Sequence, residues 1–184
     1  MLSHPEWGIA AVGAIAAIIG GLAGGLSPLV VAWRFRPALV IDYQGDNRID
    51  EDRYIWIRVR IRNTGHRRAT DCQAFITAIF ELRADGSLHP VTTDSKRLQW
   101  AGGSMDTRAV PVGVEFYVDL LKVLKDIAGF GIIHDVFPSQ QDLQNYSGTY
   151  QFHLMVSGDN AAPARCRINV EYKRDWHTLR AWSG

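Results

Sequence analysis

The first apolar segment of the chain, Trp7–Trp33, contains no charged residue, whereas polar and apolar positions are interspersed after it. Glu6 precedes the segment, and Arg34 and Arg36 follow it closely. Because an α-helix rises about 1.5 Å per residue, a segment of this length is sufficient to cross a hydrocarbon core of about 30 Å. We therefore predict a transmembrane helix over residues 7–34. A cleaved signal peptide is the less favoured alternative, because no Lys or Arg precedes the apolar segment.

Small residues recur within this predicted helix at spacings of three and four, which places them on one face. Small residues allow helix backbones to approach closely in a membrane, so the pattern favours a homo-oligomer, with a tetramer preferred, over an inert tether. The residues that we expect to pack against one another or to line a pore are Gly13, Ala17, Gly20, Gly24 and Ser27, and Ala10 continues the same face.

The charges that flank the apolar segment predict its orientation. Residues 1–6 contain no Lys or Arg, whereas Arg34 and Arg36 follow the segment. Basic residues are retained on the cytoplasmic side of a membrane, so we predict a single-pass protein with its N-terminus outside and its C-terminal domain in the cytoplasm.

The remainder of the chain, residues 35–184, has the period-two alternation of β-strands. Tyr54–Asn63 is the clearest example, with Ile at positions 55, 57 and 61 and Val at 59 on one face and polar or aromatic residues on the other. Segments around residues 150–156 and 166–172 alternate in the same way and predict a closing hairpin. With further strands expected at 38–43, 71–82, 96–101 and 108–118, we predict a mainly β fold, an antiparallel β-sandwich that follows the membrane helix.

One region departs from this alternation. Apolar residues at Leu120, Leu121, Leu124 and Ile127 have a spacing nearer to that of a helix, so we predict a helix over Asp119–Ile127. Together with the residues that follow, this defines a partly helical insertion over about residues 119–147. A connection of that length in a compact domain is typical of a lid or a subunit contact.

A basic stripe is the strongest candidate for a binding site. Between Arg53 and Arg68 the chain has six Arg and no acidic residue, although its overall net charge is only +1. Alternate residues of a strand share one face, so a row of guanidinium groups beside an aromatic ring is suited to phosphates and bases. The expected ligand is an oligonucleotide or a cyclic nucleotide, bound by Trp56, Arg58, Arg60, Arg62, Arg67 and Arg68. One alternative is that these Arg pair with acidic residues on neighbouring strands, and another is that they contact anionic lipid headgroups.

The sequence shows no motif of an enzyme. It lacks a glycine-rich phosphate loop, a nucleophile elbow and a zinc-protease signature, so we expect no catalytic residues, no cofactor and no metal site. Cys72 and Cys166 have no partner at zinc-ligand spacing, and in a cytoplasmic domain we expect both to be reduced. The acidic residues between Gly45 and Asp52 lack the glycine and terminal glutamate of a calcium loop and predict a solvated turn.

The strand Ile57–Asn63, the turn Asn63-Thr64-Gly65 and the next strand around Ala69 and Cys72 resemble the corresponding part of bacterial immunoglobulin-like domains. The layout of one membrane helix and one β domain also resembles small bacterial antiphage effectors, including the Hailong-type channel effector. These resemblances imply an immunoglobulin-like sandwich in a bacterial inner membrane protein. They imply an oligomeric effector or ion channel whose β domain senses a nucleotide. The alternative is a membrane-tethered protein-interaction module without a pore.

Overall fold

The computed structural model describes residues 35–45, 48–125, 129–131, 147–173 and 175–184. Residues 37–184 form one compact unit. The predicted transmembrane segment, and with it Gly13, Ala17, Gly20, Gly24 and Ser27, lies outside the described residues. Among the residues that are described, no helix has the length and apolar character needed to cross a membrane.

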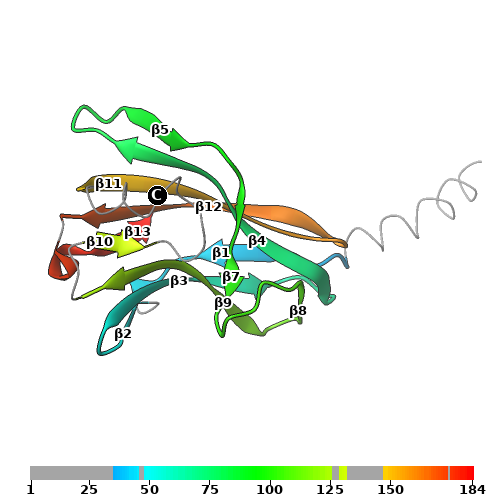
Figure 1. Cartoon of the computed structure of the whole chain (residues 1–184). Helices are drawn as coiled ribbons and strands as arrows, with labels where there is room; N and C mark the ends of the chain where they lie inside the picture. The colour runs from blue at the N-terminus through cyan, green and yellow to red at the C-terminus, as the bar shows by residue number, and fades with distance from the viewer. Residues whose placement is uncertain (1–34, 46–47, 126–128, 132–146, 174) are drawn as a thin grey trace, which may run out of the picture. The chain divides into compact units, whose positions relative to one another are not determined.

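The first of two antiparallel sheets contains the strand whose alternation is clearest in the sequence. Its main path is β1-β3-β9-β10, with β2 paired to β3 and β7 paired to β9. Figure 1 shows these strands as one layer of the domain. The strands are β1 (Leu39–Asp42), β2 (Arg48–Asp50), β3 (Tyr54–Asn63), β7 (Gln99–Trp100), β9 (Glu115–Leu124) and β10 (Gly129–Gly131).

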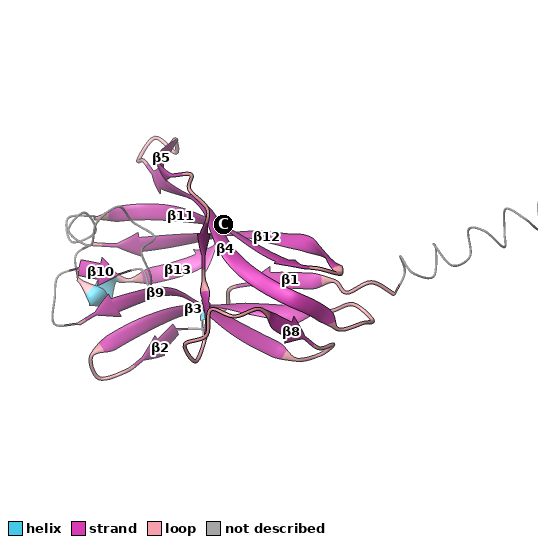
Figure 2. Cartoon of the chain, turned by 45° about the vertical axis from the view of Figure 1, so that its right-hand side comes forward, coloured by secondary structure: helices cyan, strands magenta, loops and turns pink. Residues whose placement is uncertain are grey.

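The second sheet follows the order β13-β12-β11-β4-β5, with β6 and β8 paired to β4. A 3₁₀ turn, η2 (Trp176–Thr178), precedes its last strand. In the turned view of Figure 2 the described chain is almost entirely strand and loop. The strands are β4 (Ala69–Leu82), β5 (Leu88–Thr92), β6 (Lys96–Arg97), β8 (Arg108–Val110), β11 (Gly148–Gly158), β12 (Ala161–Tyr172) and β13 (Arg180–Ser183).

The inner faces of the two sheets form one hydrophobic core, as the alternation predicts. Every second residue of β3 is fully buried, and the same holds along most of β11. Burial of apolar side chains from both sheets removes them from water and is the main force that holds the layers together. The mainly β, two-sheet sandwich is therefore confirmed. The core includes Ile55, Ile57, Val59, Ile61, Ile76, Trp100, Leu121, Phe152, Leu154, Ile168 and Val170.

The helix predicted over Asp119–Ile127 is wrong where the structure describes it. Residues 115–124 form β9, which pairs with β3 in the middle of the first sheet. The register shifts there, because Ile57 pairs with Leu121 whereas Arg58 pairs with Asp119, and Leu120 is the extra residue of a β-bulge. Leu120 and Leu121 are both fully buried, so the bulge produces the helix-like spacing. Residues 119–124 thus belong to the sheet, and Gly129–Gly131 join it as β10, which pairs with β9. Residues 126–128 and 132–146 of the predicted insertion lie outside the described residues.

Candidate anion-binding site

The predicted basic stripe lies on the outer face of β3, but its central guanidinium groups are paired with carboxylates. Arg58 Nε donates to Asp119 Oδ1 of β9 at 2.7 Å. Arg60 donates to both carboxylate oxygens of Asp42 in β1, at 2.7 and 3.1 Å, and to Glu115 of β9 at 3.0 Å. Arg62 Nη2 donates to Asp42 Oδ2 at 2.7 Å. Three carboxylates thus offset the charges of the three guanidinium groups.

The electrostatics of the stripe agree with this pairing. Hydrogen bonds from Arg60, and to a smaller extent from Arg62, lower the pKa of Asp42 despite the opposing effect of its partial burial. Asp119 is only 4% exposed, so its charge depends on Arg58 for compensation. The stripe therefore has the geometry of cross-strand ion pairs, which was the alternative weighed from the sequence.

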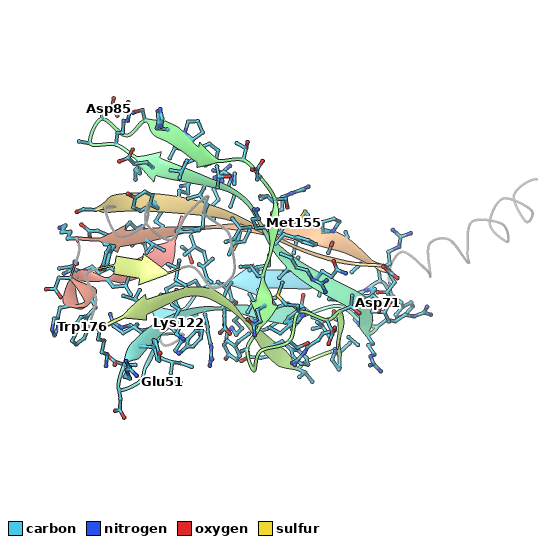
Figure 3. The ribbon with its side chains drawn as sticks, in the orientation of Figure 1. Glu51, Asp71, Asp85, Lys122, Met155 and Trp176 are labelled. Carbon is cyan, nitrogen blue, oxygen red and sulfur yellow. The ribbon has the colours of Figure 1, made fainter. Side chains whose placement is uncertain are left out.

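Trp56, the expected stacking surface, is also engaged by neighbouring side chains. Its Nε1 donates to Glu51 Oε2 at 3.2 Å. Lys122 Nζ lies 4.8 Å from the centroid of the Trp56 ring and 3.6 Å from that of Tyr54, and Arg58 Cζ lies 5.6 Å from the Trp56 ring. Figure 3 labels Lys122 and Glu51, two of the residues that contact Trp56. The Trp56 ring thus already takes part in cation–π contacts within the domain.

The other two predicted site residues, Arg67 and Arg68, do not lie on the outer face of β3. They lie in the turn between β3 and β4, where both are exposed. The Arg67 carbonyl accepts a hydrogen bond from Asn63 Nδ2 at 2.7 Å, and the Arg68 carbonyl accepts one from Asn160 Nδ2 at 3.0 Å. The structure thus separates the predicted set into a paired stripe and an exposed turn.

A second basic surface, which the sequence did not single out, lies on the outer face of the second sheet. The strand register places Arg165 of β12 opposite Met155 of β11, Met155 opposite Phe75 of β4, and Phe75 opposite Arg97 of β6. Directly paired residues share a face, and strands are about 4.8 Å apart, so this row spans about 14 Å. Figure 3 labels Met155 of this row. We call the row, with Arg167, His153 and Phe80 beside it, the outer basic face.

The arginines of the outer basic face have no acidic partner in the part of the chain that the structure describes. Among the described residues, Arg97, Arg165 and Arg167 form no ion pair, in contrast to the three arginines of the β3 stripe. Arg97 Nη2 is shielded from solvent and has no hydrogen-bond acceptor within the described part of the chain. A guanidinium group that is partly desolvated and uncompensated is stabilised by a bound anion.

Rings and a polar network adjoin these arginines. The rings of Phe80 and His153 are 4.8 Å apart at an angle of 49°, and both are partly exposed. His153 Nε2 lies 2.9 Å from Gln151 Oε1, and Gln151 Nε2 donates to Asn169 Oδ1 at 3.1 Å. Burial, followed by the nearby charge of Arg167, lowers the pKa of His153. At neutral pH this imidazole is an uncharged flat surface beside a cation.

Part of this face was visible in the sequence as the alternation of Gln151, His153 and Met155 along one predicted strand and of Arg165 and Arg167 along the next. The contribution of Phe75 and Arg97 was not, since it depends on which strands pair. The hairpin register alone would have placed Arg167 opposite His153 and Arg165 opposite Met155. A hairpin turn predicted at residues 159–160 would have set this register. It would therefore have identified the part of the outer basic face that lies on β11 and β12.

Comparison with known proteins adds no family assignment. No protein-family model matches the chain, and no curated protein matches it.

Within the described residues, no cluster of three or more His, Cys, Asp or Glu is placed to hold a metal ion. Both cysteines are free.

Proposed function

We propose that this protein is a membrane-anchored, self-associating effector whose β-sandwich binds a nucleotide or a short single-stranded oligonucleotide at the outer basic face. The observation that supports this proposal most directly is the cross-strand row Arg165–Met155–Phe75–Arg97, in which two guanidinium groups that form no ion pair with a described residue flank an apolar surface. The proposal keeps the ligand class expected from the sequence and transfers the site from β3 to the second sheet.

A nucleotide matches both components of this face. Guanidinium groups bind phosphate oxygens through charge-assisted and often bidentate hydrogen bonds. Partly exposed rings on a sheet surface are suited to stack bases, which is how several sheet-based modules recognise single strands. Phe75, Phe80 and His153 provide such rings between and beside the three arginines. A ligand with phosphates but no bases would use only half of the surface.

The membrane part of the proposal comes from the sequence. The charge-free segment Trp7–Trp33 would anchor the chain with the β domain in the cytoplasm of a bacterial cell, and the face containing Gly20 and Gly24 would bring several helices together, in a tetramer by preference. An apolar pore lined by such a helix face can close by dewetting. The immunoglobulin-like character of the sandwich and a role in antiphage defence belong to the same proposal.

Ligand binding is tested with the full chain in nanodiscs, by fluorescence anisotropy of a labelled oligothymidylate, with polyphosphate as the probe that has charge but no bases. We expect the Arg165→Ala, Arg167→Ala double variant to weaken oligothymidylate binding by about tenfold or more, since each charge-assisted hydrogen bond contributes about 1.5–3 kcal/mol. Phe80→Ala is expected to weaken oligothymidylate binding and to leave polyphosphate binding unchanged.

A matched control is Arg67→Ala with Arg68→Ala, which removes the same charge from an exposed turn elsewhere. Equal weakening by both double variants would show that binding follows net charge and would overturn the site. Arg58→Ala should leave oligothymidylate binding by the folded protein unchanged, because the guanidinium group of Arg58 forms an ion pair with Asp119.

Effector activity is tested by oligomeric state and by conductance. Cross-linking of the full chain in detergent should give a discrete oligomer, and Gly20→Ile with Gly24→Ile should dissociate it, because bulky side chains prevent close helix contact. A chain that is always monomeric, never permeabilises liposomes and does not bind the oligothymidylate would instead be a membrane-tethered protein-interaction module.

A further inference from the structure

The last strand of the second sheet presents an exposed aromatic side chain next to the outer basic face. Trp182 of β13 is 41% exposed and pairs with Asn169 of β12. Asn169 pairs with Gln151 of β11, which pairs with Phe80 of β4. Directly paired residues share one face of a sheet, so these four side chains form a second row across the strands. We call it the Trp182 row.

The indole ring of Trp182 is directed away from the core and is not engaged by its neighbours. The residue before it, Ala181, pairs with the fully buried Val170, so Trp182 is on the opposite, outer face. Its ring has no aromatic or cation–π contact with a described residue. The other tryptophans that the structure describes each have such a contact, namely Trp56, Trp100 and Trp176. An exposed ring of this kind gains by stacking against a flat ligand.

Two side-chain amides lie between the rings of the Trp182 row. Asn169 is only 8% exposed, and its Oδ1 accepts a hydrogen bond from Gln151 Nε2 at 3.1 Å. Within the described part of the chain, Asn169 Nδ2 has no hydrogen-bond acceptor. Because a largely buried donor is stabilised by an acceptor, this amide is a second and independent indication that a ligand covers the row.

The separation of the two rings sets a minimum size for this ligand. Phe80 and Trp182 lie on strands three intervals apart, and with strands about 4.8 Å apart this amounts to about 14 Å. A single base is too short to contact both rings. A ligand that stacks on both therefore needs at least two bases joined by a backbone.

The charges on the two sides of the Trp182 row differ. On one side, Arg167 follows the same face of β12 as Asn169 and forms no ion pair with a described residue. On the other side, the carboxylate of Glu171 forms an ion pair with Lys173 at 2.8 Å and lies opposite Arg180. Guanidinium groups without a carboxylate partner are the better phosphate ligands. A strand bound with its bases on the Trp182 row would thus have its phosphates over the outer basic face.

We propose that the ligand of this face is a single-stranded oligonucleotide of at least two nucleotides that crosses the strands of the second sheet. One base stacks on Phe80 and another on Trp182, and Asn169 Nδ2 donates a hydrogen bond to the ligand between them. This inference rests on the proposed function, because it extends the same site. It adds Trp182 and Asn169 to that site and excludes a mononucleotide as the ligand that fills it.

The test measures how affinity depends on ligand length, with the full chain in nanodiscs. Unlabelled thymidylates of one to six nucleotides compete with the labelled oligothymidylate. We expect affinity to rise by about tenfold or more from the mononucleotide to the trinucleotide, because a second base gains a ring to stack on. Trp182→Ala should weaken trinucleotide binding by about fivefold or more and leave mononucleotide binding within about twofold, since Phe80 remains. Trp182→Phe, which keeps a ring, should restore most of the loss.

Photochemical cross-linking locates the two bases. A trinucleotide with 5-iodouracil at one end should cross-link to Trp182, and one with 5-iodouracil at the other end should cross-link to Phe80 or His153. Mass spectrometry of the digested protein identifies the modified residue. Cross-links from both ends to the same residue would contradict a ligand that extends across the strands.

Trp56→Ala is the matched control, because it removes a partly exposed tryptophan from the outer face of the first sheet and should leave trinucleotide binding unchanged. If the wild type binds oligothymidylate but Trp182→Ala binds the trinucleotide equally well, this inference is wrong and the proposed site stands. A wild type that binds no oligothymidylate contradicts both. A change of oligomeric state in Trp182→Ala without ligand would assign Trp182 to a contact between copies of the chain, which also overturns the inference.

Discussion

Arg58 Nε donates to Asp119 Oδ1 at 2.7 Å, and Asp119 is almost completely buried beneath this contact. The pair joins β3 to β9 at the β-bulge, where the ladder of backbone hydrogen bonds changes register. A side chain first predicted to bind a ligand therefore compensates a buried charge of the domain itself.

Arg58→Ala is expected to destabilise the domain, because it leaves the Asp119 carboxylate buried without its donor. A buried group that loses its partner costs about 1–3 kcal/mol, and more when it is charged. Chemical denaturation monitored by tryptophan fluorescence measures the change. Removing both charges with Arg58→Met and Asp119→Leu should recover part of the loss, and a single variant as stable as the wild type would contradict the pair.

The ion pairs of Asp42 predict a loss of stability in acid. Hydrogen bonds from Arg60 and Arg62 lower its pKa in the folded state, so its contribution is present above the unfolded pKa of about 3.9 and is lost as the pH falls through the folded pKa. We expect Asp42→Asn to destabilise the domain at neutral pH and to reduce the fall in stability below about pH 4. Denaturation curves measured from pH 7 downwards test this. An equal loss of stability with falling pH in the wild type and in Asp42→Asn would contradict this prediction.

The parts of the fold that the sequence predicts well depend on local alternation. The predicted limits of Tyr54–Asn63 coincide with β3, and the predicted hairpin corresponds to β11 and β12. The bulge at Leu120 removes the alternation on which such a prediction depends, so β9 resembles a helix in sequence. Nothing in a single strand reveals a bulge, because it arises from a mismatch with the partner strand.

The same contrast, between a local pattern that the sequence shows and strand pairing that it does not, applies to the candidate sites. That the β3 arginines point outward is predictable, but Asp42 and Asp119, their partners, lie 18 and 61 residues away along the chain. Whether a basic face is neutralised or open is therefore a property of the sheet order. The outer basic face could not be predicted for the same reason. Phe75 and Arg97 belong to it only because β4 pairs with β11 and with β6.

Asn63→Ala should be among the most destabilising changes in the domain. It removes the partners of two backbone N–H groups and two carbonyls, and each such group left unsatisfied in a buried position costs about 1–3 kcal/mol. Asn160 is the matched control, because its side chain bridges Thr70 and Arg68 but is exposed to water. Thermal unfolding should show a much smaller effect for Asn160→Ala, and equal effects would argue against Asn63 as an organising residue.

Both thiols are expected to be unreactive in the folded protein. Burial raises the pKa of Cys72 to about 11 and that of Cys166 to about 12, so the nucleophilic thiolate is scarce near pH 8. Relative to a free cysteine with a pKa of about 8.5, we expect alkylation to be slower by at least about 100-fold. Mass spectrometry after iodoacetamide treatment measures the rate, and the same protein in denaturant is the control. Rapid native labelling of either cysteine would contradict the burial of its thiol.

His153 reports directly on the charge of the outer basic face. Burial lowers its pKa, and Arg167, which lies opposite it on β12, lowers it further, while Phe80, Thr77 and Gln151 contribute no charge. Arg167→Ala should therefore raise the pKa of His153 but leave it below about 6.5, because the effect of burial remains. Arg165→Ala, opposite Met155, should not change it. NMR titration of the imidazole protons measures each value, and a pKa unaffected by Arg167→Ala would remove that cation from the site. A phosphate bound beside Arg167 would raise the pKa in the wild type, so the titration also detects occupancy of the face by an anion.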